Sequence, residues 1–178
     1  MTRDDILASI EDNVQNQNLI KHMLATEAIM RALARRLGQN EEEWGLTGLL
    51  HDIDVELTEG DKHSHSKLGA DLARELGANS DMSHAILCHN EAHGVPCQTL
   101  LEKALFCADP LTGLITAAAL VRPDKKLAGV ETRSIMKRFA AGANREGIAK
   151  CSGIGLELEE FVALGLEAMQ GIADELGL

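Results

Sequence analysis

One stretch of the chain gathers side chains that bind metal ions. Residues 48–73 read GLLHDIDVELTEGDKHSHSKLGADLA, and their candidate ligands are His51, Asp52, Asp54, His63 and His65. Imidazole and carboxylate donors together suit Mn, Fe, Co, Ni or Zn better than Mg or Ca, which prefer oxygen-only shells. Such a metal lowers the pKa of bound water and neutralises charge on a phosphoryl oxygen. Metal-dependent hydrolysis is therefore the first chemistry to consider.

Four further histidines lie outside this stretch, at His22, His84, His89 and His93. By helical spacing, His22 and His89 share faces with apolar residues, as do His51 and His65, so all four are predicted to point inward. A core histidine satisfied by an ordinary hydrogen bond is the alternative for each one alone. Several buried imidazoles together favour a metal, because each would otherwise need a partner of its own.

The remaining candidates have competing interpretations. His84 points away from the His89 stripe, and His63 lies in a polar segment. His93 stands four residues after His89, but it adjoins Gly94, where a positive charge suits a helix C-terminus. Asp109 precedes a proline and could be a helix N-cap or a ligand.

Helical periodicity dominates the chain, and no segment alternates as a strand would. Only 2% of residues are aromatic, which leaves a core of Leu, Ile, Ala and Met. Gly45 and Gly48 would let another helix approach closely. Pro110 is expected to open a new helix, and residues 122–134 are expected to form a loop. The expected helices span 18–38, 41–52, 66–77 from a Ser66 cap, 80–94, 98–109, 110–121 and 157–176. The prediction is an all-α bundle with a metal site between helices.

Composition and charge limit the function classes. The chain has 178 residues, enough for one domain, and a formal net charge of −11. That charge argues against long nucleic acid as the main partner. The four cysteines form no CxxC pair and are expected to be free thiols in a reducing compartment. The first residues are too polar for a signal peptide, and no apolar run approaches a membrane span, so a cytoplasmic protein is expected.

The pattern His22, His51-Asp52 and Asp109 resembles the HD-domain superfamily of metal-dependent phosphohydrolases, an all-helical fold. The resemblance is strongest over residues 18–122, with the C-terminal helices of 130–178 packed on it as part of a single domain, 1–178. It implies that these four residues ligate one metal. The segments HSKLGADLA and AILCHN resemble the elements that add two histidines, which implies His65 and His89 at a second metal bridged by Asp52. Asp54 replaces the glycine of the His-Asp-Ile-Gly variant.

Neighbouring acids and bases could complete such a site. Asp52 and Asp54 are the candidate catalytic residues. Asp54, Glu56 and Glu91 could orient a water or a ligand histidine, or they could be surface acids. The candidate phosphate-binding residues are Lys21, Arg122, Lys125 and Lys126, for which a solvated charged loop is the alternative.

The predicted function is hydrolysis of a small phosphate ester or nucleotide, assisted by one or two divalent transition metals (Mn, Fe, Co, Ni or Zn). The chain has no tyrosine, and no Ser or Cys lies in an activating motif, so no covalent nucleophile is expected. The alternatives are a di-iron oxygenase on the same scaffold and a regulatory protein whose metal is structural or absent. Six ligand-type residues exceed what a closed structural site uses, which favours an enzyme. The expected partner is a small, nucleotide-like phosphate compound, with no membrane and a possible homo-oligomer.

Overall fold

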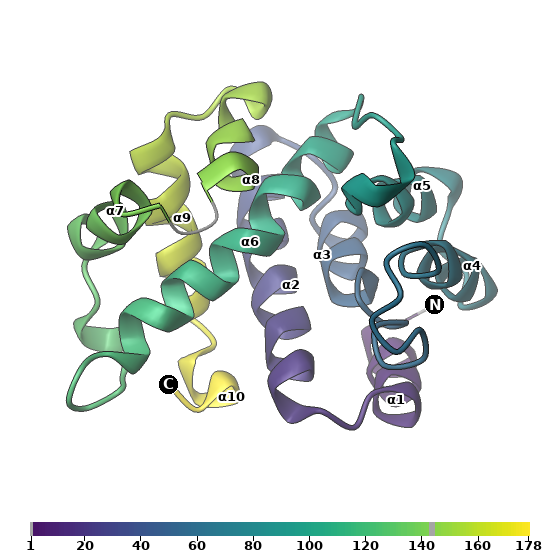
Figure 1. Ribbon diagram of the computed structural model, residues 1–178, viewed down its shortest axis with the longest axis horizontal. Coiled ribbons are helices and arrows are strands. Elements are labelled where there is room, and N and C mark those ends of the chain that lie inside the picture. Colours follow the sequence, from purple (N-terminus) through teal and green to yellow (C-terminus); the bar gives the residue numbers. More distant parts are fainter. Residues whose placement is uncertain (1, 143–144) are drawn as a thin grey trace.

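The computed structural model describes residues 2–142 and 145–178, and within these it contains helices and no strand (Figure 1). The all-α prediction is confirmed. The α-helices are α1 (Arg3–Asn13), α2 (Gln17–Leu37), α3 (Glu41–Leu50), α4 (Lys67–Glu75), α5 (Ser80–Cys88), α6 (Leu100–Leu120), α7 (Thr132–Ala140), α8 (Arg145–Ala149), α9 (Leu158–Gln170) and α10 (Ala173–Leu176). Short 3-10 helices are η1 (Glu91–His93), η2 (Leu127–Gly129) and η3 (Lys150–Ile154).

Helix α2 packs closely against α3 because two glycines of α3 face it. A Cβ atom added at Gly48 would lie 2.9 Å from the backbone oxygen of Thr26, and one added at Gly45 would meet the Arg31 side chain. The close approach expected from these glycines is therefore present. Helix α2 ends where the sequence predicted, at Gly38, which adopts a left-handed conformation with φ of 67°.

Apolar side chains form two clusters, and α2 contributes to both. Met23 belongs to the cluster shared with α1, α3, α4 and α5. Ile29 belongs to the cluster shared with α6, α7 and α9, so the helices of residues 130–178 pack on α2 and α6. In Figure 1, α6 runs diagonally across the molecule, with α3, α4 and α5 on one side and α7 and α9 on the other.

Pro110 does not open a new helix, which corrects the sequence prediction. It lies inside α6, a continuous helix of 21 residues. An interior proline costs about 3 kcal/mol. Burial of Leu105, Leu111 and Ile115 on either side of it exceeds that cost, because each such side chain contributes about 1.5–3 kcal/mol.

Among the described residues, α6 is also the one helix long and apolar enough to cross a membrane, contrary to expectation. Of its apolar stretch, 56% is buried inside the structure.

Two other helices are shorter than predicted. The helix expected over 80–94 stops at Cys88, and Asn90 then caps the separate helix η1. The helix expected over 157–176 divides at Gly171 into α9 and α10. Because α5 stops early, His89 lies at a helix end, where its ring can turn toward the other histidines.

Candidate metal centre

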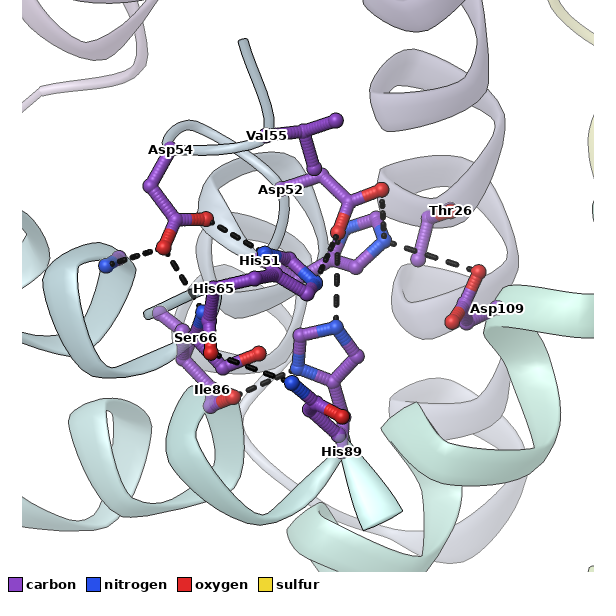
Figure 2. A network of polar contacts seen from close by, with 12 residues as sticks. Thr26, His51, Asp52, Asp54, Val55, His65, Ser66, Ile86, His89 and Asp109 are labelled. Atoms are coloured by element: carbon purple, nitrogen blue, oxygen red, sulfur yellow. Dashed lines mark hydrogen bonds and ion pairs between the residues drawn. The ribbon is translucent and has the colours of Figure 1, made fainter. Parts of the chain in front are cut away.

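Six side chains predicted as metal ligands come together from five parts of the fold (Figure 2). They are His22 of α2, His51 and Asp52 at the end of α3, His65 before α4, His89 after α5 and Asp109 in the middle of α6. The ring centroids of His22 and His51 are 5.0 Å apart, and the ring of His89 lies 5.2 Å from His51 and 5.3 Å from His65. Long-range folding therefore brings together residues that are up to 87 positions apart in the sequence.

Asp52 lies between two groups of imidazoles. Its Oδ2 atom is 3.3 Å from Nε2 of His22 and 3.4 Å from Nε2 of His51. Its Oδ1 atom is 3.5 Å from Nε2 of His65 and 3.4 Å from Nε2 of His89. Donor atoms about 2.0–2.2 Å from a metal are separated by about 3–3.6 Å, so each oxygen faces a group with suitable spacing. The arrangement can hold an ion on either side of one bridging carboxylate.

His51 and His89 are oriented by the helices that they terminate. Nδ1 of His51 donates to the carbonyl of Gly48 at 2.7 Å, and Nδ1 of His89 donates to the carbonyl of Ile86 at 2.6 Å. In its neutral form each ring therefore carries its proton on Nδ1, which makes the Nε2 atom facing Asp52 the nitrogen that can bind a metal. The helix ends thus select the tautomer that can bind a metal.

Asp54 orients His65 through Nδ1, the ring nitrogen that does not face Asp52. Its fully buried carboxylate accepts Nδ1–H of His65 on Oδ1 at 2.8 Å, and it accepts the backbone N–H groups of Ser66 and Gly69 on Oδ2 at 2.7 and 2.8 Å. The hydroxyl of Ser66 makes no capping bond, which corrects the prediction that Ser66 caps α4. Asp54, twelve residues before Ser66 in the sequence, caps α4 instead. With both oxygens engaged inside the protein, it is placed to position a ligand histidine rather than to meet substrate.

A threonine of α6 orients His22. The hydroxyl of Thr112 donates to the carbonyl of Asp109 at 2.8 Å, so its oxygen accepts Nδ1–H of His22 at 2.8 Å. Nε2 of His22 then lies 3.1 Å from Oδ1 of Asp109. Because Asp109 lies inside α6, the alternative that it is a helix N-cap does not hold.

The electrostatics of the cluster suit a cation. Burial alone would lower the pKa of His51, but the charge of Asp52 and a hydrogen bond to Asp109 hold it well above its ordinary value. Burial would raise the pKa of Asp52, yet His51 and its neighbours hold it well below the usual range. The negative carboxylates therefore favour the protonated form of these imidazoles. A divalent cation replaces such protons with the same sign of charge.

The other histidines lie elsewhere. His63 is exposed, and Nδ1 of His84 pairs with Oε1 of Glu102 at 2.8 Å. Nε2 of His93 donates to the backbone carbonyl of His65 at 2.6 Å. His93 therefore supports the backbone of a candidate ligand, a role that its sequence position alone did not indicate.

Two of the predicted acids make their contacts outside the candidate ligand set. Glu56 accepts the backbone N–H groups of Gln15 and Asn16 at 2.9 and 2.7 Å, which ties the α1–α2 connection to the loop after α3. Glu91 pairs with Lys150 at 3.2 Å. Of the three acids that were expected to orient a water or a histidine, Asp54 is the one that contacts a candidate ligand.

The basic turn predicted to hold phosphate lies beyond the end of α6. Arg122 bonds to Asp124 and to the carbonyl of Gly129, and Lys125 and Lys126 are exposed. Arg122 stands thirteen positions after Asp109, a distance of about 20 Å at helical rise. The structure places this turn away from the centre, and the phosphate contact of these residues stays a prediction. Lys21 lines a different cavity, beside His22 and the C-terminal residues.

A cavity of about 950 Å³ opens on the centre. Its lining includes Asp52, His65, His89, Asp109, Lys62 and Arg145. The sequence reasoning missed both of these bases. Lys62 stands three residues before His65, so its position in the ligand-rich stretch was a usable signal. Arg145 belongs to no motif and reaches the cavity through the packing of α8 on α6.

Comparison with known proteins identifies the family. The HD domain family matches residues 19–114, more than half of the chain. The chain belongs to the HD domain family. This is a family of metal-dependent phosphohydrolases whose domains bind divalent metals, and the HD domain described here has His/Asp groups that could hold them. The predicted family is thereby confirmed.

The curated relatives of this HD domain include several proteins named Ribonuclease Y. That of Oleidesulfovibrio alaskensis is 30% identical over 139 residues, which cover 74% of this chain and 26% of the relative. That of Syntrophotalea carbinolica is 28% identical over 151 residues, which cover 83% of this chain and 27% of the relative. The chain therefore spans about a quarter of the length of the relatives that it matches. No solved structure matches it significantly.

Proposed function

We propose that this HD domain hydrolyses a phosphate ester of a nucleotide-like compound with the help of two divalent transition metals. The observation that carries the proposal is the position of Asp52, whose two oxygens face separate pairs of imidazoles. His22, His51, Asp109 and Oδ2 of Asp52 would hold one ion. His65, His89 and Oδ1 of Asp52 would hold the other. The donors suit Mn, Fe, Co, Ni or Zn.

The chain's own residues prepare the reaction. A metal bound there supplies a water of lowered pKa and neutralises charge on the phosphate. Asp54 and Thr112 fix the rings of His65 and His22, so little reorganisation is needed when the site is filled. In the described part of the chain, the cavity lining contains no serine or cysteine, which supports direct attack by water over a covalent intermediate.

The cavity favours a small anionic substrate. Its volume of about 950 Å³ is at the upper end for small-ligand sites. Lys62 and Arg145 line it and could contact phosphate oxygens, while Asn90 offers an amide for a sugar or base. The formal net charge of −11 opposes a long polyanion but not a single nucleotide, whose charge a pair of dications and two bases can balance.

RNA is a second candidate substrate, and the comparisons support it. The relative of Oleidesulfovibrio alaskensis named Ribonuclease Y matches 74% of this chain. A phosphodiester of an RNA end would use the same metals and the same cavity. Because the chain covers about a quarter of those relatives, their activity does not transfer to it without a test.

The deciding experiment compares both substrate classes on one preparation. Chelated protein is reloaded with Mn, Fe, Co, Ni or Zn and is given nucleoside phosphates, cyclic nucleotides and short single-stranded RNA. Hydrolysis of nucleotides that disappears in Asp52→Ala but persists in Asp12→Ala supports the proposal, since Asp12 is an exposed residue of α1. Shortened RNA with intact nucleotides supports the second candidate. Oxygen consumption by the iron-loaded protein, without phosphate release, would overturn both.

A further inference from the structure

A second group of metal-ligand side chains lies outside the centre, where α5 meets the start of α6. It contains His84, Cys88 and Glu102, and one ligand atom of each lies within 4.8 Å of the others. His84 and Cys88 are four residues apart on α5, so their side chains share one face of the helix. Nδ1 of His84 is 2.8 Å from Oε1 of Glu102.

A fourth donor comes from the segment between η1 and α6. The Sγ atom of Cys97 lies 3.3 Å from the Sγ atom of Cys88, and the thiol of Cys97 also approaches the carbonyl of Cys88 at 3.5 Å. Cys88 thus belongs both to the group with His84 and Glu102 and to the sulfur pair with Cys97, at a junction of three chain segments. An ion pair between His84 and Glu102 accounts for two of these groups but not for the paired thiols.

We propose that His84, Cys88, Cys97 and Glu102 bind a Zn²⁺ ion in a closed structural site. Donor atoms at zinc bond lengths of about 2.0–2.3 Å are separated by about 3.3–3.8 Å in a tetrahedron. The sulfur pair at 3.3 Å already has such a separation, and the ligand atoms of His84, Cys88 and Glu102 lie within 4.8 Å of one another, near that range. Two thiolates select zinc over the harder dications that an all-oxygen site takes.

Glu102 is already oriented for this role. Its Oε2 atom accepts the backbone N–H groups of Gln98 and Thr99 at the start of α6, which leaves Oε1 directed at His84. A ligand carboxylate held by hydrogen bonds on its other oxygen is the usual arrangement in metal sites. A surface cavity of about 440 Å³, lined by Cys88 and Cys97, gives an ion access.

Zinc at this site would link α5, which directly precedes His89, to α6, which contains Asp109. Cys88 directly precedes His89, and Glu102 stands seven residues, or about two helical turns, before Asp109 on α6. Binding at the junction would therefore fix the segment between α5 and α6. The site is separate from the proposed catalytic function, and either can fail without the other.

Cobalt tests this site without interference from the metal centre. Reduced, chelated protein is titrated with Co²⁺, and the sulfur-to-cobalt charge-transfer absorption in the near ultraviolet is recorded. The His/Asp centre has no sulfur donor, so that band reports the four-residue cluster alone. We expect the band in the unaltered protein and in Asp52→Ala, bleaching when Zn²⁺ is added, and Co²⁺ binding weakened more than about tenfold in Cys97→Ser and His84→Ala.

Matched variants make the result decisive. Cys151→Ser removes a buried thiol elsewhere in the fold and should keep the band. Circular dichroism of every variant separates loss of the ligand from loss of the fold. If the reduced protein gives no band, or if the band survives in both Cys97→Ser and His84→Ala, the proposal is overturned. A band that excess Zn²⁺ leaves unchanged contradicts the choice of zinc.

Discussion

Asp54 accepts the Nδ1 proton of His65 at 2.8 Å, and its other oxygen accepts two backbone N–H groups at the start of α4. One buried carboxylate therefore orients a candidate ligand and begins the helix that follows it. A Cβ atom added at Gly69 would lie 3.0 Å from Oδ1 of Asp54, so this glycine leaves space for the carboxylate. The position occupied by glycine in the His-Asp-Ile-Gly variant thus has a specific use in this chain.

Replacing Asp54 with asparagine should weaken metal binding on the His65 side. Asparagine has one side-chain oxygen, so it can accept from His65 or from the two backbone N–H groups, but not from all three. The ring of His65 therefore loses its fixed orientation. Loss of such a supporting partner usually costs about 10–100-fold in metal affinity. Metal titration monitored by calorimetry measures the effect, with Asp12→Asn as the exposed control. Equal affinities in Asp54→Asn and the unaltered protein would contradict the positioning role.

The contact between α2 and α3 depends on Gly48. In Gly48→Ala, the new methyl group would approach the backbone oxygen of Thr26 to 2.9 Å, which a rigid helix cannot avoid without shifting. We expect a loss of about 1–3 kcal/mol in the free energy of unfolding, measured by urea denaturation. Gly153→Ala is the control, because its methyl group would meet only the flexible end of Lys103 at 3.8 Å. Similar losses in both variants would mean that the close approach is unimportant.

Periodicity was enough to predict the all-α fold and the inward faces of four histidines, whereas the full set of six residues came from the resemblance to the HD-domain superfamily. His22, His51, His65 and His89 each lie on an apolar helical face or helix end, and burial then forces their rings together. These signals are local, so they are visible in the sequence.

The features that the sequence did not predict depend on long-range packing. Local rules end a helix at Pro110, whereas burial on both sides of it keeps α6 continuous. Arg145 reaches the cavity only because α8 packs on α6, and the basic residues after α6 are carried away from the centre by the same continuous helix. Charge near a motif in sequence is therefore a weak guide to charge near it in space.

The two bases that line the cavity give a direct test of where phosphate binds. Lys62→Ala and Arg145→Ala should each raise KM for a nucleotide by about tenfold while leaving kcat similar, since they would bind phosphate equally in ground and transition states. Steady-state kinetics on the substrate found in the screen measures both constants.

The double variant Lys125→Ala/Lys126→Ala is the matched control for this test. It removes two positive charges at an exposed turn beyond α6 and should leave KM unchanged. If this control raises KM as much as Lys62→Ala does, the phosphate binds where the sequence first indicated and not in the cavity.

The response of stability to pH should differ between metal-free and metal-loaded protein. Burial lowers the pKa values of His22, His51 and His65, but neighbouring carboxylates raise all three above the ordinary value. A histidine with a raised folded pKa stabilises the fold fully below its unfolded pKa of about 6.5, and that contribution disappears as pH rises through the folded pKa. Asp52 and Asp109, whose pKa values are lowered, titrate in acid and do not contribute in this window.

Metal-free protein should therefore melt at a lower temperature as pH rises from about 6.5, provided that chelator is present throughout. Metal-loaded protein should gain stability relative to it over the same range, because ligand imidazoles must lose their protons before they bind. Calorimetric melts of both forms across this range measure the divergence. His51→Gln should reduce it, since that variant lacks the most strongly shifted histidine and one ligand. Parallel curves for the two forms would show that the imidazoles do not exchange protons for metal.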